Sequence, residues 1–284
     1  RIADLIRAGM PTPRVGPIRP PLVVYTSGTT GKPKGVPPLD PSTADMARVE
    51  SYYASVLGHP RMPADARMLL TLPLHHAAGP FYANAACQRG GTVVLLDPYD
   101  PERAAGLIEQ HRIQTWTAVP TMLLRLKALP DAVLDRYDLS SIEALIVGAA
   151  AVPQALKEWA IKRFGEGVLW ETYGCSEAGM LTYASPDDQL TRPGTSGRPF
   201  DEVTLRVVDE QWNDVTVGAI GEIAAATPVV VDRYLGRGPM GPDQFRAGFY
   251  RTGDIGRLDP DGYLYITDRV KDMIVAGGVN IYPA

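Results

Sequence analysis

The stretch "TWTAVPTMLLRLKALPDAVLDRYDLSSIEALIVG", from Thr115 to Gly148, decides the fold. It begins and ends with short apolar runs, residues 115–120 and 143–148, whose length and composition are typical of buried strands. The residues between them are numerous enough for a helix. Buried strands that alternate with helices indicate a mostly parallel sheet covered on both faces. The stretch therefore predicts an α/β protein.

The same alternation extends to both sides of this stretch. Ser42, with Asp45 three residues later, is expected to cap a first helix. Asp100 followed by a proline is expected to open another, and a third should run from Pro153 to a stop at Gly165. Further strands are predicted at residues 22–27, 68–73, 92–97 and 168–174. The sequence thus predicts a mostly parallel sheet layered with helices.

The pattern of predicted secondary structure changes after about Ser185. Short β-rich runs at residues 203–209, 221–227 and 262–268 are separated by turns rich in Gly, Pro and Asp. We therefore expect an α/β core over residues 1–184 and a smaller β subdomain over residues 185–268.

Composition narrows the class of protein. The 284 residues are 45% hydrophobic and 21% charged, which is typical of a soluble globular protein. The formal net charge of −4 gives no basic footprint for nucleic acid, and no apolar run is long enough to cross a bilayer. Cys87 and Cys175 have no metal-type spacing, so we expect reduced thiols in a cytoplasmic protein.

Both ends of the chain indicate a piece of a longer protein. The chain begins at Arg1 and not at methionine, and it stops at "GGVNIYPA", after which nothing would complete a fold. We expect that an N-terminal part and a C-terminal domain are missing.

The segment "YTSGTTGKPKGV", Tyr25 to Val36, has the residues of a phosphate-binding loop. Its glycines free backbone N–H groups to face an anion, its hydroxyls add donors, and its lysines add charge. It is not a Walker A loop, because Lys32 is followed by Pro33, which would disrupt the helix that such a loop enters. This disfavours a P-loop GTPase or kinase. From composition alone, a polar surface turn is an equally good interpretation.

The segment closely resembles the phosphate loop of the adenylate-forming superfamily. That superfamily includes acyl-CoA synthetases, luciferases and the adenylation domains of peptide synthetases. Other segments resemble its motifs in the same order along the chain: "LPLHHAAG", "GAAAVP", "YGCSEAG", "GTSGRPF", "GEI", "YRTGD" and "DRVKDMIVAGGVNIYP". The resemblance runs from about Leu22 to the last residue, and it is greatest to acid–CoA ligases.

The resemblance implies a reaction in two steps. A carboxylic acid and ATP give acyl-AMP and pyrophosphate, and the acyl group then passes to the thiol of CoA. ATP, Mg²⁺ and CoA are the implied cofactors, and a small-molecule acid is the implied partner. The apolar character of the expected acyl site favours a fatty or aromatic acid.

The resemblance also implies roles in nucleotide binding. Lys34 would carry positive charge to the phosphates, and Glu177 would bind Mg²⁺. Tyr173 would lie flat on the adenine, Asp254 would accept hydrogen bonds from the ribose hydroxyls, and Arg269 would reach the ribose or the α-phosphate. The full implied ATP set is Thr26, Ser27, Gly28, Thr29, Thr30, Gly31, Lys34, Gly148, Ala149, Ala150, Tyr173, Gly174, Ser176, Asp254 and Arg269.

Other residues are implied at the acyl site and at the end of the chain. His76 corresponds to a histidine near the acyl carboxylate, where we expect a gating role, and it completes the implied catalytic set with Lys34 and Glu177. Lys271 corresponds to the hinge before the C-terminal domain, so residues 269–284 would hold that hinge and the start of the domain. The implied acyl lining is His76, Ala77, Ala78, Gly79, Phe81 and Cys175.

Several alternatives stay open. A peptide-synthetase adenylation domain is disfavoured, because "HAAGPFYANAA" offers no acidic residue for a substrate amine. A ligase that loads a carrier protein in place of CoA, or a luciferase, has no feature against it. A nucleotide-binding relative without catalysis is disfavoured by the joint presence of Lys34, Glu177, Asp254 and Arg269. The acid used and the oligomeric state are not predicted.

Overall fold

The computed structural model describes residues 23–26, 33–60, 62–63 and 65–269, together with the backbone alone of residues 274–276 and 279–281. Among the predicted site residues, six lie outside the described residues: Ser27, Gly28, Thr29, Thr30, Gly31 and Lys271.

The larger of two main sheets has seven strands in the order β4-β3-β5-β6-β7-β8-β9. Its five parallel strands are β3 (Arg67–Leu70), β4 (Thr92–Leu95), β5 (Thr115–Ala118), β6 (Ala144–Gly148) and β7 (Leu169–Cys175). The antiparallel strands β8 (Gly179–Ala184) and β9 (Arg198–Pro199) extend it at one edge. The predicted mostly parallel sheet is confirmed.

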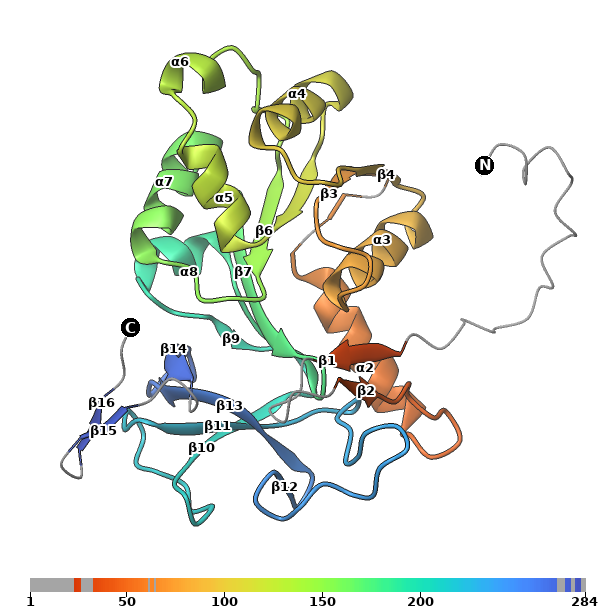
Figure 1. The fold of residues 1–284 in the computed structure, drawn as a ribbon, viewed down its shortest axis with the longest axis vertical. Coiled ribbons are helices and arrows are strands. Elements are labelled where there is room, and N and C mark those ends of the chain that lie inside the picture. The colour runs from red at the N-terminus through yellow and green to blue at the C-terminus, as the bar shows by residue number, and fades with distance from the viewer. Residues whose placement is uncertain are drawn as a thin grey trace, which may run out of the picture.

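Helices cover both faces of this sheet (Figure 1). On one face Trp116 and Leu145 pack with apolar residues of α4, α5 and α7. On the other face Met68 and Ile146 pack with α3. Leu145 and Ile146 face opposite sides because successive side chains alternate along a strand. The helices are α2 (Met46–Gly58), α3 (Ala78–Gln88), α4 (Pro101–His111), α5 (Pro120–Lys127), α6 (Asp131–Leu134), α7 (Gln154–Phe164) and α8 (Pro186–Thr191).

The ends of three helices correct one prediction and confirm two. The cap of α2 is Asp45, whose carboxylate accepts the Arg48 N–H at 3.3 Å. Ser42 is not the cap, because its hydroxyl donates to Asp40 in the preceding turn. Asp100 caps α4 as predicted, and α7 ends at Gly165, whose φ of 115° is readily adopted only by glycine.

The smaller sheet is antiparallel and has five strands. Its order is β10-β11-β13-β12, with β14 also paired to β13. The strands are β10 (Thr204–Val208), β11 (Gly221–Ala226), β12 (Phe245–Arg246), β13 (Phe249–Leu258) and β14 (Leu264–Arg269). This sheet is the predicted β part of the fold. The division of the chain at residues 184 and 185 stays a prediction, since α8 and β9 beyond it still contact the larger sheet.

Two short hairpins complete the described structure. One consists of β1 (Val24–Thr26) and β2 (Lys34–Val36), and the other of β15 (Ile274–Ala276) and β16 (Val279–Ile281). Figure 1 shows the β1–β2 hairpin beside the end of β7, where the two main sheets meet. Among the described residues, none of the helices combines the length and the apolar character that a membrane crossing requires.

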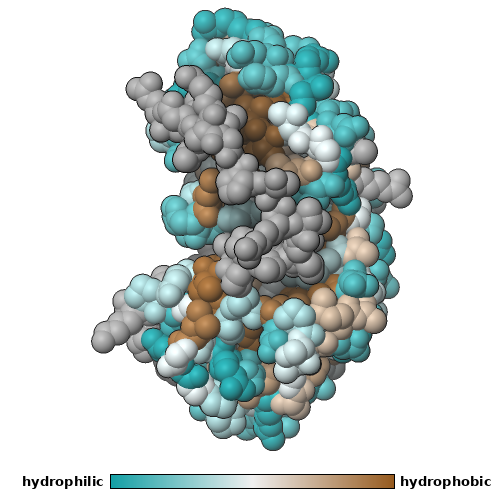
Figure 2. Space-filling model, turned by 90° about the vertical axis from the view of Figure 1, so that its right-hand side faces the viewer, coloured by the Kyte–Doolittle hydropathy of each residue, from teal (hydrophilic) through white to brown (hydrophobic). Residues whose placement is uncertain are grey.

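The two sheets are joined by an apolar cluster. Ala178 and Leu181, at the start of the β8 hairpin arm, pack against Ala225 of β11 and Tyr250 of β13. In Figure 2, apolar surface lies on both sides of the indentation between the two lobes. The carboxyl end of β7 is therefore fixed at the junction, with side chains of both sheets around it.

Candidate active site

One group of candidate residues is centred on Asp254, which β13 holds at the junction with only 5% of its surface exposed. The Tyr173 hydroxyl, from β7, donates to its Oδ2 at 2.7 Å. Arg269 Nε, from the paired strand β14, donates to Oδ1 at 2.9 Å. Burial and the adjacent Asp254 carboxylate raise the pKa of Tyr173 well above its usual value, so this phenol is a stable donor.

A second group surrounds Glu177, in the turn between β7 and β8. This carboxylate is 8% exposed, and its Oε1 accepts a 2.9 Å hydrogen bond from the hydroxyl of Tyr234. The ammonium of Lys34, on β2, lies 4.8 Å from the centre of the Tyr234 ring. That distance is within the range of a cation–π contact. Tyr234 therefore contacts the two charged residues that the sequence assigns to the phosphates and the metal.

Cys175 lies near both groups. Burial raises the pKa of its thiol to about 12, and the negative charges of Glu177 and Asp254 contribute to the rise. The side chain packs in the same apolar cluster as Tyr173. The thiol is therefore neutral and poorly suited to act as a nucleophile, and its predicted place in the acyl lining stays a prediction.

The predicted adenine-side loop begins where β6 ends. Gly148 pairs with Thr172 of β7, and a Cβ at Gly148 would collide with the Thr172 carbonyl oxygen. Ala149 then adopts a left-handed φ of 64°, which turns the backbone away from the sheet. Ala150 follows on the exposed surface. This loop lies at the carboxyl edge of the parallel strands, where open α/β sheets bind ligands.

The predicted acyl-side residues lie at the start of α3. The rings of His75 and His76 are exposed, with their centroids 4.5 Å apart. Gly79 is buried, and a Cβ there would collide with the backbone carbonyl of Pro73. Phe81 packs in the clusters that join α2 and α3 to the larger sheet. The small size of Gly79 is thus required for close backbone packing.

The comparison with known families decides the classification. Residues 6–235 match the model of a family described as AMP-binding enzyme. The chain belongs to the AMP-binding enzyme family.

Three relatives show the range of this AMP-binding family. The chain is 38% identical over 263 residues to a medium/long-chain-fatty-acid–CoA ligase of Mycobacterium tuberculosis, covering 92% of this chain and 44% of that protein. The structure of the amide bond synthetase McbA of Marinactinospora thermotolerans is similar with a TM-score of 0.76 and 31% identity, covering 92% of this chain and 51% of the other. The structure of o-succinylbenzoate CoA synthetase of Bacillus subtilis with ATP and magnesium is similar with a TM-score of 0.74 and 29% identity, covering 92% of this chain and 52% of the other.

The chain spans about half the length of the AMP-binding relatives that it matches. In the described part, the structure brings Tyr173, Asp254 and Arg269 together, and it places Lys34 and Glu177 around one ring. Thr26 pairs with Lys34 across the β1–β2 hairpin, and so marks the other side of the predicted phosphate loop. Gly174 and Ser176 flank Cys175 where β7 ends and the turn to β8 begins, and a Cβ at Gly174 would collide with the Gly179 carbonyl. Their roles toward ATP stay predictions.

Sequence reasoning missed three residues of this AMP-binding chain. Tyr234 lies 57 positions from Glu177, in a segment of Arg, Gly and Pro with no apolar period, so no local pattern indicates its role. Lys157 and Glu171 form a buried ion pair between α7 and β7. Lys157 lies on α7, which has a regular apolar face, and nothing in the spacing of its apolar residues indicates that this lysine is buried.

We expect the two cysteines of this AMP-binding chain to differ sharply in reactivity. Cys87 is exposed on α3, whereas the Cys175 thiol, with its pKa of about 12, has a thiolate fraction of roughly 10⁻⁴ at about pH 8. Iodoacetamide followed by peptide mass spectrometry should label Cys87 alone in the folded protein, and both cysteines in urea. Equal labelling of the two in the folded state would contradict this account of Cys175.

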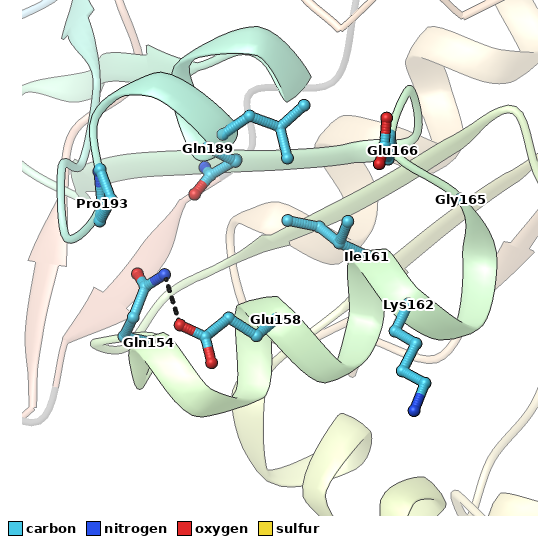
Figure 3. Close-up of a pocket in the computed structure, with 9 residues that line it drawn as sticks. Gln154, Glu158, Ile161, Lys162, Gly165, Glu166, Gln189 and Pro193 are labelled. Atoms are coloured by element: carbon cyan, nitrogen blue, oxygen red, sulfur yellow. Dashed lines mark hydrogen bonds between the residues drawn. The ribbon is translucent and has the colours of Figure 1, made fainter.

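One surface groove of the described residues lies away from these groups. It measures about 600 Å³ and is lined mainly by α7 and α8 (Figure 3). Gln154 and Glu158 on its rim are hydrogen-bonded to each other at 3.2 Å. None of the candidate site residues lines this groove, so it has no part in the proposal below.

Proposed function

We propose that this chain is the nucleotide- and acyl-binding part of an ATP-dependent acid–CoA ligase. Its substrate carboxylate attacks the α-phosphorus of ATP, and the bond to the pyrophosphate oxygen breaks. The CoA thiol then attacks the acyl carbon, and AMP leaves. The observation that carries the proposal is the pairing of Lys34 and Glu177 around Tyr234, beside the Tyr173–Asp254–Arg269 group.

The two groups suit opposite ends of a nucleotide. Asp254 is a hydrogen-bond acceptor held by two donors, which is the chemistry that a ribose diol would join. Lys34 supplies a cation for the phosphates, where charge develops as pyrophosphate leaves. The Arg269 side chain is largely exposed beside Asp254, so a guanidinium lies next to the proposed ribose site while β14 fixes its backbone.

The residues present fit Mg²⁺ held jointly with a nucleotide. Glu177 is a carboxylate, the ligand type that this ion prefers, and the described residues contain no cluster of three or more His, Cys, Asp or Glu that would hold a metal alone. Magnesium would therefore take its other ligands from phosphate oxygens and water. When bound, it supplies charge neutralisation between the phosphates, and Glu177 holds it in place.

The acid is proposed to be fatty or aromatic. Apolar surface flanks the indentation in Figure 2, and the named relatives include a fatty-acid ligase and an o-succinylbenzoate synthetase. The acceptor is proposed to be CoA. An amine is the second candidate, because the amide bond synthetase is similar at a TM-score of 0.76. The cytoplasmic location expected from the two free cysteines belongs to the same proposal.

We expect the full-length protein to catalyse acid-dependent exchange of labelled pyrophosphate into ATP. Fatty, aromatic and amino acids should be compared at equal concentration, because only the acid that fits the apolar site will support exchange. Exchange with amino acids alone would replace the ligase by a peptide-synthetase assignment. Addition of CoA, an amine or a carrier protein to the active acid then identifies the acceptor by the product formed.

A further inference from the structure

The segment from Thr227 to Leu235, which follows β11, is bonded to the turn that carries Glu177. The Thr227 hydroxyl donates to the Ala178 carbonyl at 2.9 Å, and the Val231 N–H donates to the Glu177 carbonyl at 2.9 Å. These bonds hold two successive carbonyls of the turn, those of Glu177 and Ala178. The turn is therefore fixed by the segment that follows β11 and not only by its own hairpin.

The same segment is bonded to the hairpin that carries Lys34. The Leu235 N–H donates to the Gly35 carbonyl at 2.8 Å. A Cβ at Gly35 would lie 3.2 Å from a methyl carbon of Leu235, so the Leu235 side chain packs closely over Gly35. One segment of nine residues thus links the two pieces of chain that are proposed to bind phosphate and metal.

Tyr234 lies where these two links meet, and only 6% of its surface is exposed. Its hydroxyl binds Glu177 at 2.9 Å, and its ring face lies 4.8 Å from the Lys34 ammonium. The Tyr234 side chain therefore contacts the Glu177 carboxylate through its hydroxyl and the Lys34 ammonium through the face of its ring.

We propose that Tyr234 is a positioning residue that sets the Glu177 carboxylate and the Lys34 ammonium at fixed places before Mg²⁺ and ATP bind. The hydroxyl orients the metal-binding carboxylate, and the ring holds the phosphate-binding cation. Preset charges need no reorganisation when the polyphosphate arrives. The inference rests on the proposed function, and it adds a residue that the phosphate-loop motif does not contain.

Two variants of the full-length protein separate the two contacts. Tyr234→Phe removes only the hydroxyl, and a hydrogen bond to a charged group is strong enough that we expect the Mg²⁺ concentration for half-maximal pyrophosphate exchange to rise roughly tenfold. Tyr234→Leu also removes the ring, and should raise the KM for ATP a further two- to fivefold, roughly the worth of an ammonium–ring contact. At saturating Mg²⁺ and ATP, Tyr234→Phe should keep a kcat close to that of the wild type.

Tyr137→Phe is the matched control. The Tyr137 hydroxyl, in the bend after α6, donates to the Glu102 carboxylate of α4 at 3.0 Å, so the substitution removes the same kind of bond away from the candidate site. It should leave the Mg²⁺ and ATP dependence unchanged. Thermal unfolding of all three variants reports any loss of folded protein, which lowers the amount of active enzyme but does not move half-saturation.

Two results would overturn the inference. One is a Tyr234→Phe variant with wild-type Mg²⁺ and ATP dependence. The other is a Tyr137→Phe variant whose half-saturating Mg²⁺ concentration rises as much as that of Tyr234→Phe. Calorimetric titration of Mg²⁺·ATP into the same variants gives a readout that needs no turnover. If the wild type binds Mg²⁺·ATP without acid-dependent exchange, the ligase assignment fails, and the titration still decides the role of Tyr234. If the wild type does not bind Mg²⁺·ATP at all, both fail.

Discussion

Replacing Glu177 by glutamine lowers the rate of adenylation by at least about 10²-fold, as the loss of one preset charge-stabilising group typically does. Glutamine has the shape of glutamate, and its amide oxygen still accepts the 2.9 Å bond from Tyr234. The substitution therefore removes the negative charge and leaves the surrounding contacts in place. A neutral amide is a weak ligand for a hard divalent cation, so the loss should fall on the metal-assisted step.

The measurement is acid-dependent pyrophosphate exchange by the full-length protein, at Mg²⁺ concentrations up to saturation. Glu166→Gln is the control, because Glu166 is an exposed carboxylate beside the groove of α7 and α8. It removes the same charge far from the candidate site, and should leave the rate unchanged. An undiminished rate in Glu177→Gln would remove this residue from the mechanism.

Lys157→Met destabilises the fold by about 3–5 kcal/mol. Lys157 and Glu171 form an ion pair in the interior, with 2% and 6% of their surfaces exposed, and the Lys157 ammonium also donates to the Thr195 carbonyl at 3.0 Å. Methionine fills much of the volume but leaves the Glu171 carboxylate buried without its cation. The double variant Lys157→Met, Glu171→Leu removes both charges, and should recover most of the loss.

The pH dependence of this effect has a defined sign. Burial raises the pKa of Glu171, and the Lys157 charge opposes that rise, so loss of the lysine raises the pKa further. A carboxyl group whose pKa is higher in the folded state favours folding while it is protonated, below its unfolded pKa. That contribution is lost as the pH rises through the folded pKa. The deficit of Lys157→Met should therefore be smaller at about pH 5 than at about pH 8.

Urea unfolding of the single and double variants measures both effects. Arg163→Met provides the comparison, because Arg163 is also on α7 and pairs with Asp135 at 2.7 Å in a more exposed setting. We expect a cost within about 1 kcal/mol there. A Lys157→Met cost no larger than that of Arg163→Met would show that the interior pair is dispensable.

The sequence predicts the parallel sheet well because its strands are buried on both faces. Residues 144–148 form β6 as predicted, because an apolar run of this length suits the interior of a parallel sheet that is covered on both faces. The cap of α2 was predicted wrongly at Ser42, since Ser42 and Asp45 are both good caps and only the tertiary path of the chain selects Asp45. Local patterns thus define the elements but not which of two equivalent residues begins one.

The candidate site is less predictable because its contacts join distant residues. Tyr173 and Asp254 are 81 positions apart, and each alone looks like an ordinary strand or turn residue. The family resemblance identified both, but it gave no indication that they bond each other. Tyr234 escaped notice because its importance comes from two partners in other elements, and nothing in the neighbouring residues reflects them.

The shared carboxylate of Asp254 has a consequence for protein engineering. Its two oxygens accept from β7 in one sheet and from β14 in the other, so the lobes are not interchangeable modules. A chimaera joined between Pro199 and Thr204, made to transplant acid preference from a relative, takes position 173 from one parent and positions 254 and 269 from the other. One parent must therefore supply a phenol at 173, and the other a carboxylate at 254 with a guanidinium at 269. Hybrids that keep these partners should fold and bind nucleotide. Hybrids that lose one of them leave the buried Asp254 carboxylate without that partner where the two sheets meet.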